Sequence, residues 1–258
     1  VLGRTLWQLF TVLKGFSKGE TSLLSSWMLV VTFALAFYFI LSGFFDMAKG
    51  IGELFGISLR SSFYYPYQGA SISDFTYRFH STLRKVVVNG VYLPLVDESQ
   101  SVLADIAALL ISNMLFGLWF GFTFNYALWG AFLALFLLLE KYVYPKALGK
   151  LPTVLGRLYT VVVVLLSFPL ITENSFGGTF TLYRNLFSFT GSTIPLYNDK
   201  IIYIITSNWF VLLIAAVLSI NAIENFSRWL RQTVPKFSRV AQVTVTVVLF
   251  ILVTAVLV

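Results

Sequence analysis

The stretch from Ser22 to Phe45 contains no charged residue and consists mostly of large apolar side chains. Roughly 20 consecutive apolar residues are enough to cross a bilayer as one α-helix. Further apolar runs follow, and only 11% of the residues are charged, against about 25% in soluble domains. Because helices satisfy their own backbone polar groups in lipid, we expect an all-α, polytopic membrane protein.

The remaining segments divide between further spans and one long polar region. Residues Val1 to Gly19 are expected to form a short amphipathic helix. The block from Val102 to Tyr144 has the length of two spans, with a helix break expected between Gly117 and Thr123. Later spans are expected at Leu158–Ile171, where Pro169 ends or kinks the helix, at Ile201–Ile220 and at Val240–Val258.

Basic residues fall in the connections between apolar runs, which explains a net charge of +7. Anionic lipid headgroups are therefore their expected partners, and no basic-aromatic module suggests nucleic acid. By the positive-inside rule, Thr172–Lys200 lies outside, and two connections lie in the cytoplasm. The basic residues of these two connections are Lys141, Lys146, Lys150, Arg157, Arg228, Arg231, Lys236 and Arg239. Orientation before Val102 stays open, because the polar segment Asp46–Gln100 could hold re-entrant helices.

The segment Asp46–Gln100 carries the only histidine of the chain, His80. Ionisable groups among membrane helices are costly, so such a residue suggests a functional site. The absence of cysteine excludes disulfides and thiolate metal sites, and we expect no metal centre. The sequence has neither a phosphate-binding loop nor a Gly-x-Ser-x-Gly elbow. An ordered series of intramembrane charges is also missing, so a channel or transporter is not favoured.

Several short motifs follow one another in a characteristic order. They are SGFFDMAKGIG at 42–52, LFG at 54–56, FYYPY at 63–67, SISDF at 71–75, RFH at 78–80, YLPL at 92–95, GLWFG at 117–121, NYALWG at 125–130 and LLEK at 138–141. In this order they resemble bacterial membrane-bound O-acyltransferases, in particular the branch that O-acetylates cell-envelope polysaccharides. Motif-level resemblance covers about residues 43–140, with weaker similarity beyond.

The resemblance implies a single membrane-embedded domain over residues 1–258, a ring of tilted helices with re-entrant segments around a central tunnel. The amino-terminal spans of a longer protein would be missing, in line with a first residue that is Val1. The implied location is the bacterial inner membrane. An acyl-CoA or an acyl carrier protein would supply the thioester donor without a bound cofactor. An extracytoplasmic SGNH or esterase-like protein is the implied partner.

At one motif position the chain departs from the family, which has histidine where this sequence has Phe120. That histidine is the family's presumed general base, and phenylalanine cannot accept a proton. Neighbouring polar family residues are replaced together at Val87–Gly90. Two functions therefore stay open: an active acyltransferase that relies on His80, with water or the thiolate leaving group taking the proton, and an inactive homologue that acts as a structural or partner-docking subunit.

Each candidate site residue also has a purely structural interpretation. His80 could be a neutral imidazole bonded between helices, and Phe120 would fill the volume of the lost imidazole. Asp74 lies four residues before Arg78, a spacing that favours an ion pair. The resemblance places six further residues in the substrate tunnel: Asp46, Arg78, Gly117, Trp119, Gly121 and Asn125. Glycines in this spacing also serve helix packing, and Asp46 could mark the membrane interface.

Overall fold

The computed structural model describes residues 1–17, 19–97, 101–144, 152–173, 175–189 and 194–221, and six single residues beyond them: 225, 228, 229, 232, 233 and 244. All regular elements in these ranges are helical, and no strand occurs there. Four helices are long and apolar enough to cross a membrane: Leu23–Leu54, Phe124–Val143, Thr153–Thr172 and Asp199–Leu218. The expected all-α, polytopic membrane protein is confirmed. The predicted span Val240–Val258 lies outside the described residues, except for Thr244.

Helices α1 (Leu2–Lys14) and α2 (Leu23–Leu54) pack against each other along their lengths. Ser22 caps α2 by accepting from the Ser25 N–H, and the Ser25 hydroxyl accepts in return from the Ser22 N–H. The helix continues to Leu54, nine residues past the end of the predicted span at Phe45. The uncharged stretch ends at Asp46, but this segment remains helical despite Gly50 and Gly52. At about 1.5 Å per residue, α2 is longer than a bilayer core of about 30 Å.

Helices α6 (Val102–Leu118) and α7 (Phe124–Leu138) form a hairpin, and the helix break expected between Gly117 and Thr123 is present. A π-helical turn, η3 (Leu139–Val143), continues α7. Two glycines bring the hairpin backbones together: an added Cβ would lie 2.1 Å from the Tyr126 carbonyl O at Gly117, and 2.0 Å from the Asn113 carbonyl O at Gly130.

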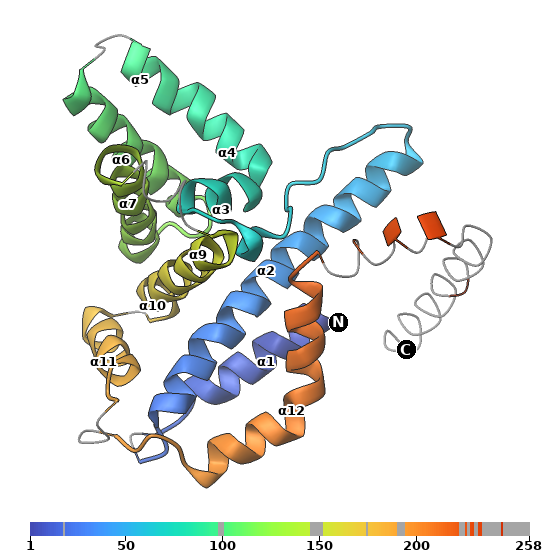
Figure 1. The fold of residues 1–258 in the computed structure, drawn as a ribbon, viewed down its shortest axis with the longest axis vertical. Coiled ribbons are helices and arrows are strands. Elements are labelled where there is room, and N and C mark those ends of the chain that lie inside the picture. The colour runs from blue at the N-terminus through green and yellow to red at the C-terminus, as the bar shows by residue number, and fades with distance from the viewer. Residues whose placement is uncertain are drawn as a thin grey trace.

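Short helices fill the polar segment between α2 and α6 (Figure 1). They are the 3₁₀ turn η1 (Pro66–Gln68), α3 (Ile72–Arg78), α4 (Ser81–Val87), the π-helical turn η2 (Val88–Tyr92) and α5 (Leu93–Asp97). In Figure 1, α4 and α5 lie beside the α6–α7 hairpin, while α1 and α12 both lie on the same side of α2.

The last described helices are α9 (Thr153–Ser167), α10 (Pro169–Thr172), α11 (Phe176–Leu186) and α12 (Asp199–Leu218). Pro169 occupies the first turn of α10 and interrupts the α9–α10 span, as predicted. Helix α9 begins at Thr153, before the predicted Leu158. Only 17% of the span window of α12 is buried, so most of its apolar side chains are exposed among the described residues. Most of the basic connections, including Lys146, Lys150, Arg231, Lys236 and Arg239, lies outside the described residues.

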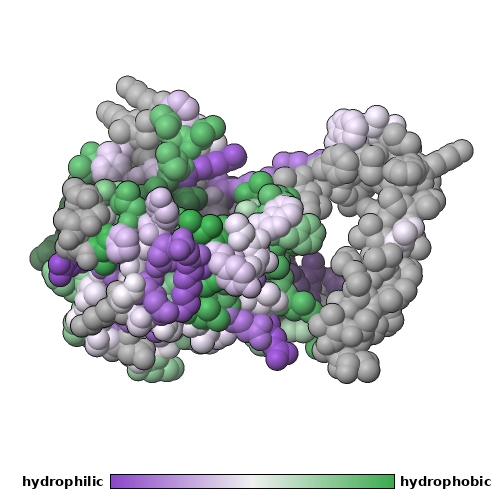
Figure 2. Space-filling view, turned by 90° about the horizontal axis from the view of Figure 1, so that it is seen from below, coloured by the Kyte–Doolittle hydropathy of each residue, from purple (hydrophilic) through white to green (hydrophobic). Residues whose placement is uncertain are grey.

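Contacts between distant segments define one end of the helix bundle, which we call the α11–α12 end. There the Leu23 N–H donates to the Pro195 carbonyl O (3.0 Å), and the Asn125 Nδ2 donates to the Glu173 carbonyl O (2.6 Å). Hydrophilic residues gather among apolar ones on this face (Figure 2). The start of α2 and the start of α7 therefore lie at the same end, and Leu54 and Lys141 point to the other.

This arrangement relates the upstream segments to the predicted topology. If Thr172–Lys200 faces outward, α2 begins outside and ends on the cytoplasmic side, together with Lys141. The α11–α12 end also carries an ion pair between the Lys200 Nζ and the Glu20 carboxylate at 2.5 Å. The hydrogen bond from Lys200 is the main reason why the pKa of Glu20 falls to about 2.

Candidate functional site

His80 forms the turn between α3 and α4 and is only 4% exposed. Its backbone adopts a left-handed conformation, with φ of 60° and ψ of 56°. Histidine tolerates this region better than most residues, but a non-glycine residue there is uncommon and often marks a site under constraint. Its Nδ1 accepts a hydrogen bond from the Leu83 N–H at 3.3 Å, so the imidazole caps α4.

The hydrogen bond to Nδ1 also fixes the tautomer of His80. An accepting Nδ1 has no hydrogen, so in the neutral ring the hydrogen resides on Nε2. Burial lowers the pKa of His80 below its usual value, which favours the neutral ring. Phe45 and Phe63 pack on the imidazole, with ring centroids 4.5 Å and 5.4 Å away. In this state His80 can donate a hydrogen bond through Nε2, while its basic nitrogen is occupied by the helix cap.

Phe120 lies in the α6–α7 turn, half-buried, with its ring centroid 6.0 Å from that of His80. Two candidate residues that are distant in the sequence are thus brought together. Phe120 also contacts the rings of Phe116 at 5.4 Å and Trp129 at 5.6 Å. The rings around it form what we call the aromatic layer: Phe37, Phe79, Phe116, Phe120, Trp129 and Phe168.

The aromatic layer occupies the middle of the bundle, where the resemblance implies a tunnel. Trp129, Phe79, Phe116 and Phe168 are almost completely buried in it. The Trp129 Nε1 donates to the Ser167 Oγ at 2.9 Å, so its polar atom is satisfied. The tunnel itself stays a prediction. Phe120 is in contact with the rings of Phe37, Phe79, Phe116 and Trp129.

The other candidate residues lie in different surroundings. Trp119 is 65% exposed and points away from the aromatic layer, although it is the neighbour of Phe120. Gly117 and Gly121 both approach Tyr126, so close packing explains their small size. Asn125 lies at the α11–α12 end, and Asp46 is exposed on the far half of α2.

Arg78 forms the ion pair that its spacing predicted, with its Nε 2.6 Å from the Asp74 Oδ1. Asp74 also accepts from the Ala70 N–H, and Arg78 donates to the Tyr64 carbonyl O at 3.4 Å. These contacts hold the loop before α3 against the helix. Both side chains are about a third exposed and border a cavity.

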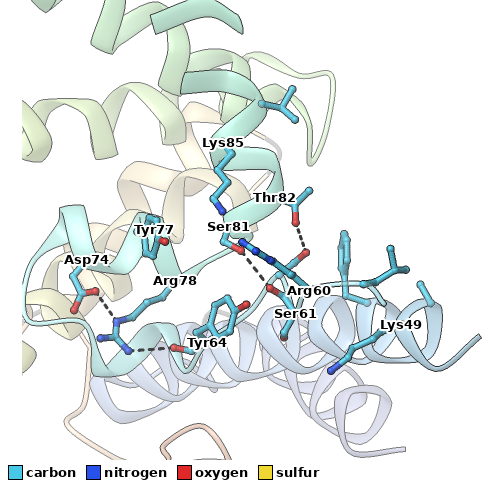
Figure 3. Close-up of a pocket in the computed structure, with 15 residues that line it drawn as sticks. Lys49, Arg60, Ser61, Tyr64, Asp74, Tyr77, Arg78, Ser81, Thr82 and Lys85 are labelled. Carbon is cyan, nitrogen blue, oxygen red and sulfur yellow. Dashed lines mark hydrogen bonds and ion pairs between the residues drawn. The ribbon is translucent and has the colours of Figure 1, made fainter. Parts of the chain in front are cut away.

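That cavity, of about 880 Å³, lies between the far half of α2, the loop that follows it, and helices α3 and α4 (Figure 3). Ser81, the residue after His80, belongs to its wall, and so does Phe45, which packs on the imidazole. Four basic side chains border the cavity, against one carboxylate, Asp74: Lys49, Arg60, Arg78 and Lys85. We call it the basic cavity.

Two buried carboxylates were not recognised as site residues from the sequence. Glu140 accepts from the backbone N–H groups of Ile72 (2.5 Å) and Ser73 (2.9 Å), which fixes the start of α3 to the end of α7. Asp105 accepts from Lys141 at 2.7 Å and also from the hydroxyls of Tyr92 and Tyr142. The signal for Glu140 was its place in the LLEK motif. Asp105 offered only a lone acid in an apolar block.

No cluster of three or more potential metal-ligating side chains occurs among the described residues. The polar residues that border the basic cavity beside His80 are hydroxyl-bearing and basic, with the single carboxylate of Asp74. The arrangement suits the binding of an anionic molecule next to a hydrogen-bond donor. It offers no general base at Phe120.

No family model matches the chain. It is 27% identical over 164 residues to the probable alginate O-acetylase AlgI of Pseudomonas aeruginosa, covering 64% of this chain and 32% of that protein. It is 33% identical over 117 residues to the peptidoglycan O-acetyltransferase of Helicobacter pylori, covering 45% and 22% respectively.

A third relative, the probable alginate O-acetylase AlgI of Azotobacter vinelandii, is 24% identical over 183 residues, or 71% of this chain and 37% of that protein. The matched part therefore spans between 22% and 37% of each of these relatives. These similarities support a relationship with the membrane-bound O-acyltransferase type of O-acetyltransferase. Together with the four apolar helices, they identify the chain as an integral membrane protein.

Proposed function

We propose that this chain takes part in O-acyl transfer, from a thioester donor on the cytoplasmic side to a hydroxyl on the outer side of a bacterial plasma membrane. The acceptor is a cell-envelope polysaccharide or a partner protein that relays the acyl group. The single observation that carries the proposal is the meeting of two motif positions, His80 and Phe120, at 6.0 Å between ring centroids. Relatives named as O-acetylases of alginate and O-acetyltransferases of peptidoglycan support this reaction class.

The reaction needs three events at one carbonyl carbon. The acceptor oxygen forms a bond to the carbon of the thioester, the carbonyl oxygen gains negative charge, and the C–S bond breaks. A donor aimed at the developing oxyanion lowers the barrier, typically by about 3 kcal/mol for one hydrogen bond in a preorganised site. His80 fits this role through its Nε2–H, because Nδ1 is held by the Leu83 N–H.

The proton of the acceptor hydroxyl also needs a destination. Phe120 cannot accept it, and the basic nitrogen of His80 caps α4. The departing thiolate therefore takes the proton, directly or through a water molecule, so that the products are an ester and a free thiol. Loss of a positioned base typically costs about 10² to 10⁴ in rate. We accordingly expect slow transfer relative to an enzyme with histidine at the Phe120 position.

The proposal also assigns partners on both sides of the membrane. The donor is an acyl-CoA or an acyl carrier protein, which would approach the basic cavity. An esterase-like protein at the α11–α12 end would receive the acyl group or pass it to the polysaccharide. Sidedness supports this division, because the basic cavity and the α11–α12 end lie at opposite ends of α2.

The test is acetyl transfer from radiolabelled acetyl-CoA, or from an acetylated carrier protein, in membranes that contain the full chain and envelope polysaccharide. We expect ester formation above that of membranes without the chain, and a reduction in His80→Asn, which keeps the α4 cap but lacks the imidazole Nε2–H. Background-level transfer with both donors would reject the proposal and leave the structural-subunit function. A parallel measure of polysaccharide O-acetyl content in cells, with and without the chain, detects a requirement for partners.

A further inference from the structure

The basic cavity has an excess of positive charge that its own walls do not neutralise. Of its four basic side chains, Arg78 is paired with Asp74 at 2.6 Å, and Lys49 lies 3.9 Å from Glu53. Arg60 and Lys85 belong to none of the ion pairs found among the described residues. Two positive charges, those of Arg60 and Lys85, thus border the cavity without a carboxylate partner among the described residues.

The two unpaired side chains come from different walls of the basic cavity. Arg60 belongs to the loop after α2, and Lys85 belongs to α4. In Figure 3 both side chains extend toward the part of the cavity beside Ser81. The walls themselves are tied together by a hydrogen bond of 2.7 Å between the hydroxyls of Ser62 and Thr82. The Ser62–Thr82 hydrogen bond therefore fixes the distance between the loop that carries Arg60 and the helix that carries Lys85.

The rest of the lining combines hydroxyl groups with aromatic and aliphatic side chains. Hydroxyl groups of Ser61, Ser81 and Thr82 also border the cavity. Ser61 and Ser81 donate to backbone carbonyls and Thr82 pairs with Ser62, so the donors for a phosphate group are Arg and Lys, which are usual partners of phosphate oxygens. The rings of Tyr64 and Tyr77 also border the cavity and are 41% and 57% exposed. A volume of about 880 Å³ lies within the range of small-molecule sites, about 300 to 1,000 Å³.

From this arrangement we propose that the basic cavity is a binding site for a phosphate ester, with Arg60 and Lys85 as its principal charge contacts. The assignment of that ester to the acyl donor rests on the proposed function, whereas the site itself rests on the cavity. Two molecules carry this chemistry on the cytoplasmic side: a soluble nucleotide-containing thiol such as coenzyme A, and the headgroup of an anionic phospholipid. The exposed tyrosine rings favour the soluble molecule, since a ring can stack on its base.

The experiment measures binding without turnover, using the full chain in nanodiscs made of zwitterionic lipid. Coenzyme A is titrated by calorimetry against the wild type, Arg60→Gln, Lys85→Gln and the double variant. Arg184→Gln in α11 removes the same charge at the α11–α12 end and serves as the matched control. We expect each cavity variant to weaken binding about tenfold, as loss of a charge-assisted hydrogen bond predicts, and Arg184→Gln to leave the Kd unchanged.

A second arm replaces part of the lipid with phosphatidylglycerol and counts retained lipid by native mass spectrometry. If only phosphatidylglycerol binds, and Arg60→Gln and Lys85→Gln release it, the phosphate site stands and its ligand is the lipid. If neither ligand responds to these variants more than to Arg184→Gln, the proposal is overturned. Both variants are at exposed positions, and size-exclusion and circular dichroism profiles identify a variant that does not fold. Binding of coenzyme A without acyl transfer would keep this site and reject the proposed function.

Discussion

The α3–α4 turn and the α6–α7 turn meet at the centre of the molecule, yet they are built by opposite physical means. The first holds His80 in a left-handed backbone conformation and uses its imidazole as a helix cap. The second places Phe120 among aromatic rings, on a hairpin whose backbones touch at glycines. A side-chain hydrogen bond to the backbone stabilises the α3–α4 turn, and close packing stabilises the α6–α7 turn.

This difference shows how one motif position can lose its chemistry without loss of the fold. An imidazole at Phe120 would need a hydrogen-bond partner, because buried polar groups are costly when unpaired. Phenylalanine in the aromatic layer has no such need. The His80 turn cannot change in the same way, since its side chain supplies a bond that the α4 backbone requires. We expect the two turns to respond differently to substitution.

The largest effect is expected at the hairpin glycines. In Gly130→Ala the new methyl group would lie 2.0 Å from the Asn113 carbonyl O, so α6 and α7 have to separate. Overpacking of this kind typically costs about 1 to 3 kcal/mol and occasionally more, and contact with backbone puts this case at the upper limit. Denaturant unfolding in mixed micelles measures it. Gly43→Ala is the matched control, with open space around its Cβ, and equal stability of the two variants would contradict the close approach.

The next effect tests the aromatic layer at Phe120. Phe120→Ala should destabilise the protein by about 2 to 3 kcal/mol, somewhat less than full burial would give, because the ring is half-buried. Phe120→His should cost less packing but leave a polar ring among Phe116 and Trp129. The free energies of unfolding of both variants decide this. The aromatic-layer interpretation fails if Phe120→Ala is as stable as the wild type.

Glu140 joins the two regions, because it extends from the end of the hairpin to the start of α3. In Glu140→Ala, the N–H groups of Ile72 and Ser73 lose their acceptors, and we expect a loss of about 2 kcal/mol. Glu53→Ala removes an equal charge from an exposed pair at 3.9 Å and should change stability by less than about 1 kcal/mol. Equal losses in the two variants would show that the anchor contributes nothing specific.

Sequence reasoning identified the helical class, the Gly117–Thr123 break, the interruption at Pro169 and the Asp74–Arg78 ion pair. All four depend on local rules of apolarity, glycine and proline content, or helical spacing. The helical extension of α2 from Asp46 to Leu54 was not predicted, since the apolar pattern marks the uncharged span and not the end of the helix.

The site was less accessible, because its contacts join segments that are distant in the sequence. Nothing in the local pattern predicts that Glu140 caps α3, or that Asp105 accepts from Tyr92 and Tyr142. The left-handed backbone of His80 was also hidden, since histidine carries no signal comparable to glycine. The resemblance marked both His80 and Phe120, but only the packing shows one as a helix cap and the other as part of an aromatic layer.

A change in stability as large as that of Glu140→Ala is expected at His80, where the choice of substituted residue decides the outcome. His80→Ala removes the cap and places alanine at φ of 60°, which together should cost about 2 kcal/mol. His80→Asn keeps both features, because asparagine tolerates this conformation and caps helices well. Thermal unfolding should therefore rank Asn close to the wild type and Ala below it, and the opposite ranking would contradict the cap.

Acidification separates the cap from other roles of the imidazole. Burial holds the pKa of folded His80 below the value of 6.5 expected in the unfolded chain. Between those two pKa values the unfolded chain binds more protons, so stability rises with pH across this window and falls as the pH drops below about 6.5. Protonation would also place a hydrogen on Nδ1, which could then no longer accept from Leu83. His80→Asn has no group that titrates there, and its stability should be flatter over the same range. Parallel pH profiles of wild type and His80→Asn would show that the neutral imidazole is not what holds the α3–α4 turn.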